Sequence, residues 1–306
     1  MNTLLVLEQV LNGLQLGVML FLLAAGLTLV FGIMDLINLA HGSLYMVGAF
    51  VAASVAHWTG SFVWGLLAAV PAAAALGMAI ELLALRTLYA RSHLDQVLAT
   101  FGLILFLNEA VRMLWGPQAV FVDMPPALDG TVEIVPGAPY PLYRLAVVAV
   151  GVAVAGFLYV LIARTRIGML IRAGASNREM LGALGVDVRR LYTLVFGLGA
   201  ALAGLAGAMA GPLLAVEVGM GEGILILTFV VIVIGGIGSI RGALVGALLV
   251  GMVDTLGRAF LPTLLRLAVG PATADSVGAS LSSMAIYILM AAVLFWRPRG
   301  LFPAHG

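Results

Sequence analysis

Apolar residues are gathered into nine long runs, and polar residues lie mostly in the segments between them. Most runs are close to the roughly 20 residues that an α-helix needs to cross a bilayer. The runs at 43–57 and 224–238 are short enough to be half-helices or re-entrant segments. We therefore predict an all-α, polytopic integral membrane protein with eight or nine transmembrane segments. The nine runs lie at about 10–32, 43–57, 62–85, 95–115, 142–163, 191–211, 224–238, 243–261 and 278–296.

The composition supports a membrane environment. Hydrophobic residues make up 63% of the chain and charged residues only 9%, against about a quarter charged in soluble domains. We expect one transmembrane domain over residues 1–306. The first basic residue is Arg86, so the first apolar run lacks the basic region of a secretory signal peptide and is expected to remain in the mature protein.

The arginines predict the orientation, because basic loops stay on the cytoplasmic side. With nine crossings, an outside N-terminus and a cytoplasmic C-terminus, eleven of the fifteen arginines lie inside. The reverse orientation inverts that ratio, so we reject it. The inside arginines are Arg86, Arg91, Arg164, Arg166, Arg172, Arg178, Arg189, Arg190, Arg241, Arg297 and Arg299.

The longest outer connection, residues 116–141, holds six of the twelve prolines, three acids and no basic residue. Residues 131–135 predict a short strand that Pro136, Pro139 and Pro141 bring to an end. This acidic segment is either an inert connector or a docking surface for an external substrate-binding protein.

The connection at 164–190 carries six arginines against Glu179 and Asp187, and we expect it to be cytoplasmic. Ser176 and Glu179 have S-x-x-E spacing, which predicts a capping box and the start of a helix at Ser176. Met180, Leu181 and Leu184 then share one face, and Gly185 suits the left-handed stop.

Such a two-turn helix is marginal in water and needs a partner surface. One candidate is the membrane interface, with arginines against anionic lipid headgroups. The other is a groove on a cytoplasmic protein that receives the apolar face as anchors.

Polar residues also lie between the first two apolar runs, at Asp35, Asn38, His41 and Tyr45. Ionisable groups at membrane depth are rare and usually functional, so gating or substrate contact is one interpretation. The other is that Asn38 and His41 cap a broken helix. An ionised Asp35 is expected at the cytoplasmic rim or beside a water-filled cavity.

Enzymatic chemistry is not indicated. Cysteine is absent, all basic residues are arginine, and the GxxxxGK[ST] phosphate loop needs a lysine. We expect no metal, no cofactor and no nucleic-acid partner. Glu81, Glu109 and Asp254 are expected near helix ends, reaching the interface. The GxxxG pairs, such as Gly13 with Gly17, are expected to pack helices.

Three motifs carry a resemblance to a known family. Residues 37–48 read I-N-L-A-H-G-S-L-Y-M-V-G, which resembles the I-N-x-A-H-G-x-x-Y-M-x-G signature of LivH-like branched-chain amino-acid permeases. Gly235, Gly236 and Gly238 lie in a G-G-I-G-S-x-x-G-A block similar to that family's. Glu179 and Gly185 have the spacing of the E-A-A-x-x-x-G loop by which ABC import permeases engage their ATPases, although both alanines are replaced and the following I-x-L-P is absent.

Two departures qualify the likeness. The family often has a lysine or another polar residue before the Gly-Gly block, where this chain is apolar. Sugar-importing relatives typically read D-x-S-x-G where this chain has N-L-A-H-G from Asn38, which favours the amino-acid branch.

The resemblance implies a permease subunit of an ATP-driven importer in the bacterial inner membrane. Its implied partners are a second related permease, two cytoplasmic ABC ATPases that hydrolyse the ATP, and an external binding protein. Urea, short amides or a simple sugar are alternative cargoes, and a secondary transporter or channel is a rival class. The implied ATPase-coupling residues are Ser176, Arg178, Glu179, Met180, Leu181, Leu184 and Gly185. The pathway or gating candidates are Asp35, Asn38, His41, Tyr45, Gly235, Gly236 and Gly238.

Overall fold

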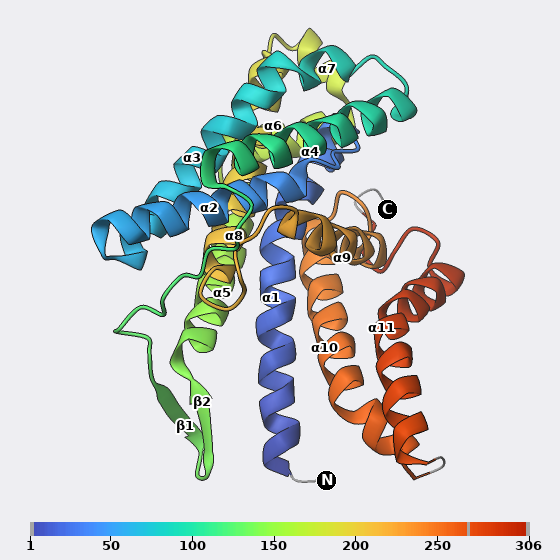
Figure 1. Cartoon of the computed structure of the whole chain (residues 1–306). Coiled ribbons are helices and arrows are strands. Elements are labelled where there is room, and N and C mark those ends of the chain that lie inside the picture. The colour runs from blue at the N-terminus through green and yellow to red at the C-terminus, as the bar shows by residue number, and fades with distance from the viewer. Residues whose placement is uncertain (1–2, 268–269, 304–306) are drawn as a thin grey trace.

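A computed structural model describes residues 3–267 and 270–303, and most of these residues are helical (Figure 1). The nine apolar runs correspond to α1–α5 and α8–α11, so the prediction of a mainly helical chain is confirmed. The elements are α1 (Thr3–Met34), α2 (His41–Thr59), α3 (Phe62–Leu83), the 3₁₀ turn η1 (Leu85–Leu88), α4 (His93–Trp115), β1 (Thr131–Val135), β2 (Ala138–Pro141), α5 (Leu142–Arg164), α6 (Arg166–Ser176), α7 (Arg178–Ala183), α8 (Val188–Ala210), α9 (Met220–Gly235), α10 (Ile240–Leu265) and α11 (Pro271–Trp296).

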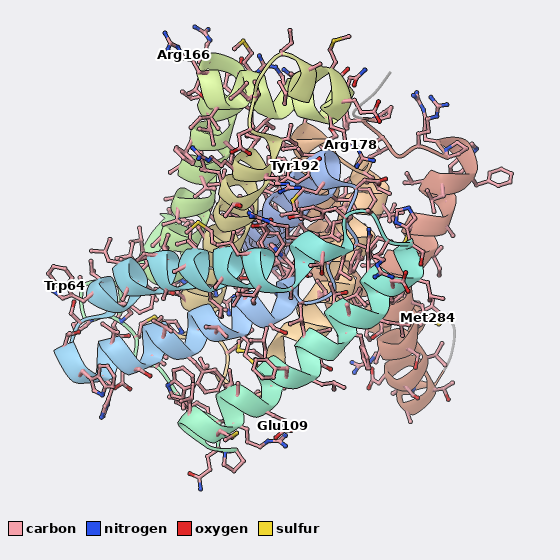
Figure 2. The ribbon with its side chains drawn as sticks, turned by 90° about the horizontal axis from the view of Figure 1, so that it is seen from above. Trp64, Glu109, Arg166, Arg178, Tyr192 and Met284 are labelled. Carbon is pink, nitrogen blue, oxygen red and sulfur yellow. The ribbon has the colours of Figure 1, made fainter. Side chains whose placement is uncertain are left out.

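Seven helices in these ranges are long and apolar enough to cross a membrane. The shorter α9 has 16 residues, about 24 Å at 1.5 Å per residue, against a hydrocarbon core of about 30 Å. Many large apolar side chains point away from the bundle, and Figure 2 places Trp64 and Met284 at its edge. The chain is therefore a polytopic membrane protein.

Helix α1 stands at the centre of the bundle and contacts α5, α8, α9 and α10 (Figure 1). It begins near the β1–β2 hairpin and ends near α6 and α7. We call these two ends of the molecule the hairpin end and the arginine-rich end. Most of α1 beyond Leu16 is buried, so its continuous apolar sequence reflects a helix enclosed by other helices rather than by lipid.

Small residues let the helix backbones approach closely. Gly13 faces Met252 of α10, and Gly17 faces Leu248, so the two helices run antiparallel. On α2, Gly48 lies directly against the backbone of Gly204 in α8. The predicted packing role of the small residues is confirmed at these crossings, since an added methyl group would meet backbone atoms.

The predicted strand at 131–135 is confirmed as β1. The sequence analysis missed its antiparallel partner, β2, and its statement that prolines end the strand was incomplete. Pro139 and Pro141 lie within β2, opposite Glu133 and Thr131. Proline is tolerated there because a two-stranded sheet has only edge strands.

Glu81 lies near the end of α3, as predicted, but neither Glu81 nor Asp254 reaches water, and Asp254 is not near a helix end. Glu81 is completely buried, and Asp254 lies well inside α10 with Arg258 as its ion-pair partner. Arginine partners stabilise both carboxylates inside the protein, so neither has to reach water. Glu109 is exposed and pairs with Arg112, as a surface residue would.

Candidate coupling site and helix junctions

The connection between α5 and α8 folds into two short helices at the arginine-rich end. The Thr165 hydroxyl accepts a hydrogen bond from the Gly168 amide at 3.0 Å and caps α6. Gly168 is packed so closely against the Leu161 and Ile162 carbonyls that a side chain would not fit. Sequence analysis missed α6 as a separate helix, although a threonine cap before an amphipathic segment was present as a signal.

The predicted capping box at Ser176 and Glu179 is wrong. Ser176 is the last residue of α6, and Asn177 caps α7 with its Oδ1 2.9 Å from the Met180 amide nitrogen. Asn177 has extended backbone angles, whereas Ser176 is still helical, so only Asn177 can serve as the N-cap.

The predicted stop at Gly185 is confirmed. Its φ is +85°, and the Val186 amide donates to the Leu181 carbonyl across the turn. This is the geometry of a left-handed helix end, which favours glycine. Helix α7 has six residues and is therefore shorter than the two turns predicted.

The predicted apolar face of α7 is divided between two surroundings. Met180 and Leu184 are 58% and 75% exposed, whereas Leu181 is 4% exposed and packs near Gly174 of α6. Leu181 thus anchors α7 to the protein, contrary to the prediction that all three residues face a partner. The exposed pair, Met180 and Leu184, is what remains for another molecule to contact.

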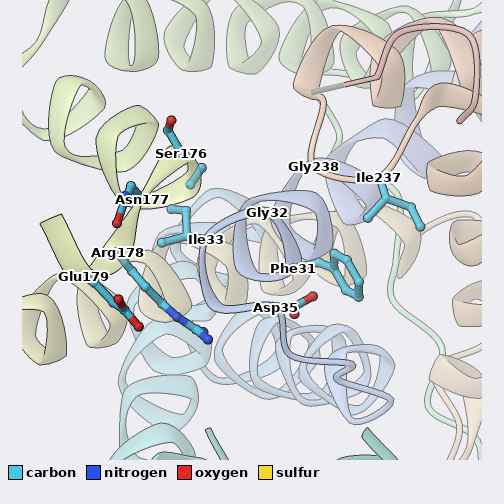
Figure 3. Close-up of a pocket in the computed structure, with 12 residues that line it drawn as sticks. Phe31, Gly32, Ile33, Asp35, Ser176, Asn177, Arg178, Glu179, Ile237 and Gly238 are labelled. Atoms are coloured by element: carbon cyan, nitrogen blue, oxygen red, sulfur yellow. The ribbon is translucent and has the colours of Figure 1, made fainter. Parts of the chain in front are cut away.

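A hollow of about 460 Å³ lies where the end of α1, the α6–α7 corner and residues 237–238 meet (Figure 3). Asp35, Arg178 and Glu179 are among its lining residues. Asp35 has a φ of +51°, which is uncommon for a residue other than glycine. Within the described residues its carboxylate has no hydrogen-bond or ion-pair partner. The hollow therefore joins one pathway candidate, Asp35, to the first residues of α7.

The other polar candidates near α2 are not in this hollow. Asn38, His41 and Tyr45 are all buried. The Asn38 Oδ1 accepts a hydrogen bond from the Ala40 amide at 3.1 Å, which agrees with a local capping role for Asn38. The Leu23 backbone lies close to the His41 ring, but neither ring nitrogen has a partner with hydrogen-bond geometry in the described residues.

The glycine block at 235–238 forms the turn between α9 and α10. Gly235 packs against Gly242, Gly238 packs against Gly32 of α1, and Gly236 has a φ of +107° that favours glycine. The amides of Leu301 and Phe302 donate to the Ile234 and Gly235 carbonyls at 2.9 and 2.8 Å. These bonds satisfy the free carbonyls at the end of α9. Gly238 also lines the hollow with Asp35.

A buried polar cluster that sequence analysis missed ties α3 to α8. The Glu81 carboxylate accepts hydrogen bonds from Arg86, Tyr89 and Thr193, with the Thr193 hydroxyl at 2.7 Å. Burial and the bond to Glu81 raise the pKa of the Tyr89 hydroxyl. The signal was the spacing of Glu81, Arg86 and Tyr89, but Thr193 is distant in sequence. The cluster fixes the start of α8, directly after the α6–α7 connection.

These features define a class before any comparison: a polytopic helical membrane protein with a short helix exposed at one end. The chain belongs to the family described as branched-chain amino acid transport system / permease component, whose model matches residues 9–294. The predicted resemblance is therefore confirmed.

Curated relatives cover most of the chain. The permease protein BraD of Pseudomonas aeruginosa, of a high-affinity branched-chain amino acid transport system, is 32% identical over 310 residues, covering 96% of this chain and 95% of BraD. LivH of Escherichia coli K12 is 31% identical over 84% of this chain and 87% of LivH. A probable LivH of Methanocaldococcus jannaschii is 28% identical over 78% and 76%. No solved structure matches the chain significantly.

Proposed function

We propose that this chain is the membrane-spanning permease subunit of an ATP-driven importer that moves branched-chain amino acids across the bacterial inner membrane. The family match over residues 9–294 and the BraD and LivH relatives carry the proposal. ATP hydrolysis is assigned to separate ATPase subunits. A second related permease and an external binding protein complete the proposed assembly.

The proposed ATPase contact is α7 with its exposed pair, Met180 and Leu184. Asn177 and Gly185 fix the two ends of this helix, and Leu181 holds it to α6. A push on the exposed pair would therefore move the α6–α7 corner as a unit. Arg178 and Glu179 at the start of α7 line the hollow that also contains Asp35, so we propose that this motion changes the junction at the end of α1.

The proposed gating residues separate into three groups. Asp35 and Gly238 line the hollow, where they would meet a solute leaving the membrane. Asn38, His41 and Tyr45 are assigned to the hinge between α1 and α2, and Gly235 and Gly236 to the α9–α10 turn. Hinge positions act by absorbing changes in backbone angle, so neither of these sets has to touch the solute.

We further propose nine crossings with the N-terminus outside and the C-terminus cytoplasmic. The arginine distribution supports this orientation, and the antiparallel directions of α1 and α10 fit a first and an eighth crossing. A reporter fused after Arg299 should be cytoplasmic. A cysteine at the exposed Asp129, placed in this cysteine-free chain, should react with an impermeant reagent added outside. Protection of that cysteine in intact spheroplasts would overturn the orientation.

An ion-coupled secondary transporter is less well supported. Such a protein needs titratable groups available for coupling at membrane depth. Within the described residues, the two buried carboxylates, Glu81 and Asp254, are both paired with arginines. The remaining candidate, Asp35, is unpaired but exposed at the end of α1 rather than buried.

The decisive experiment is reconstitution of the tagged chain with candidate partner subunits in proteoliposomes. Uptake of labelled leucine, isoleucine and valine should require both ATP and the binding protein. Unlabelled urea or a simple sugar should not compete. Uptake that persists without an ATPase would support a secondary transporter, and competition by urea would move the cargo to the amide class.

A further inference from the structure

A larger hollow lies on one side of α1. Helices α5 and α10 both pack on α1 but make little contact with each other, and in Figure 1 they stand on opposite sides of it. Between them is a hollow of about 1070 Å³ that extends toward the arginine-rich end. Because the hollow lies between membrane-spanning helices, it can open toward the lipid.

The hollow is lined by both apolar and basic residues. Leu29, Leu158 and Leu244 contribute apolar surface from α1, α5 and α10. Arg172 of α6 and Arg241 of α10 also line it, and its described lining contains no aspartate or glutamate. Both arginines are exposed, and neither guanidinium has a hydrogen-bond or ion-pair partner among the described residues. An apolar groove with two unpaired cations calls for an anionic, partly apolar occupant.

The start of α10 points to the same chemistry. Ser239 and Arg241, at the start of the 26-residue α10, belong to the lining, and the beginning of a helix favours phosphate. Thr28 of α1 also borders the hollow, but its hydroxyl is buried away from it, so no contact with an occupant is assigned to Thr28.

We propose that this hollow binds one anionic phospholipid. Its phosphate lies between Arg172 and Arg241, and an acyl chain lies along Leu29, Leu158 and Leu244. A free anion would leave the apolar walls unused, and a neutral apolar molecule would leave both arginines unpaired. Basic pockets between transmembrane helices are known to bind anionic headgroups. Bound lipid would fill the space between α5 and α10 and steady α6, which carries Arg172 and leads into α7.

The test uses the chain purified with its partner subunits, first stripped of lipid by detergent exchange. Binding of phosphatidylglycerol and of phosphatidylcholine is measured by native mass spectrometry, and the melting temperature is recorded with each lipid. The variant is Arg172→Gln with Arg241→Gln. The matched control is Arg189→Gln with Arg190→Gln, which removes the same charge from two exposed arginines outside the hollow.

Phosphatidylglycerol should bind the parent and the control preferentially and raise their melting temperatures. Its affinity should fall roughly thirty-fold in the Arg172 and Arg241 variant, since each arginine near a membrane surface contributes about 1 kcal/mol.

Four results would overturn the proposal. One is equal binding of the two lipids by the parent, and another is an equal loss of affinity in both arginine variants. The third is full displacement of phosphatidylglycerol by inorganic phosphate, which would assign the site to a free anion. If lipid binds the isolated chain but not the assembled complex, the hollow belongs to the interface with a partner subunit. None of these outcomes depends on which solute is transported.

Discussion

The exposed pair on α7 gives the sharpest test of ATPase coupling. Full burial of a leucine or methionine side chain stabilises a contact by roughly 1.5–3 kcal/mol. Met180 and Leu184 are 58% and 75% exposed, so their burial by an ATPase should contribute about 1–2 kcal/mol each. Replacing both by aspartate should therefore weaken ATPase binding by roughly 30- to 1,000-fold. Burying the new carboxylates without partners would add to the loss.

The assay is retention of the ATPases on the purified permease, scored beside substrate uptake. Permease abundance in the membrane shows whether insertion is intact. Gly182→Asp is the charge control, because Gly182 lies on the same helix, is exposed, and is directed away from the Met180 and Leu184 face. Gly185→Val should reduce ATPase retention less than the double aspartate variant, because valine opposes the positive φ at the helix stop.

The reasoning fails if the double aspartate variant keeps its ATPases and supports normal uptake. Helix α7 would then be a membrane-interface helix, and the ATPase contact would have to be sought elsewhere, with residues 86–95 as the next candidate. It also fails if Gly182→Asp releases the ATPases to the same extent, because the effect would then come from charge alone.

Three further predictions concern the bundle. Gly48→Ala places a methyl group about 2.3 Å from the Gly204 Cα and should destabilise the permease by roughly 1–3 kcal/mol in thermal unfolding. The control, Gly102→Ala, places its methyl group in open space and should be neutral. Glu81→Gln removes the charged acceptor of the buried cluster and should lower the melting temperature by several degrees. Its control, Glu109→Gln, lies in an exposed ion pair and should change stability by less than about 0.5 kcal/mol. Equal effects of the two variants would contradict the assigned burial of Glu81. Asn38→Ala should leave complex abundance near normal and alter uptake if this residue acts in gating, and a proportional loss of both would assign it to capping.

The positions of the helices could be predicted because apolar periodicity and run length can be read from a single sequence. Residues that act across the fold were harder to assign. Glu81 looked like an interfacial residue until Thr193 of a distant helix completed its cluster. Helix α7 shows a local limit of the same kind. A one-residue difference in the cap, Asn177 instead of Ser176, depends on where α6 ends, and sequence spacing alone does not determine that boundary.

The separation between Leu181 and the exposed pair was also beyond the sequence pattern. On a helix as short as α7, neighbouring apolar residues span more than one face. Which of them turns inward is decided by the surface beneath, here the small Gly174 of α6. Tertiary contacts therefore decide which apolar residue of α7 is buried, and helical spacing alone does not.

The bonds between residues 301–302 and the end of α9 carry a consequence for biogenesis. The ribosome makes Ile234 and Gly235 before α10 and α11, yet the amides that satisfy their carbonyls belong to Leu301 and Phe302, which follow both helices. During insertion, the α9 terminus must therefore wait in water or in translocon contacts until two more helices have entered the membrane. A chain truncated before Leu301 would hold every transmembrane helix and still present unpaired backbone to the quality-control proteases.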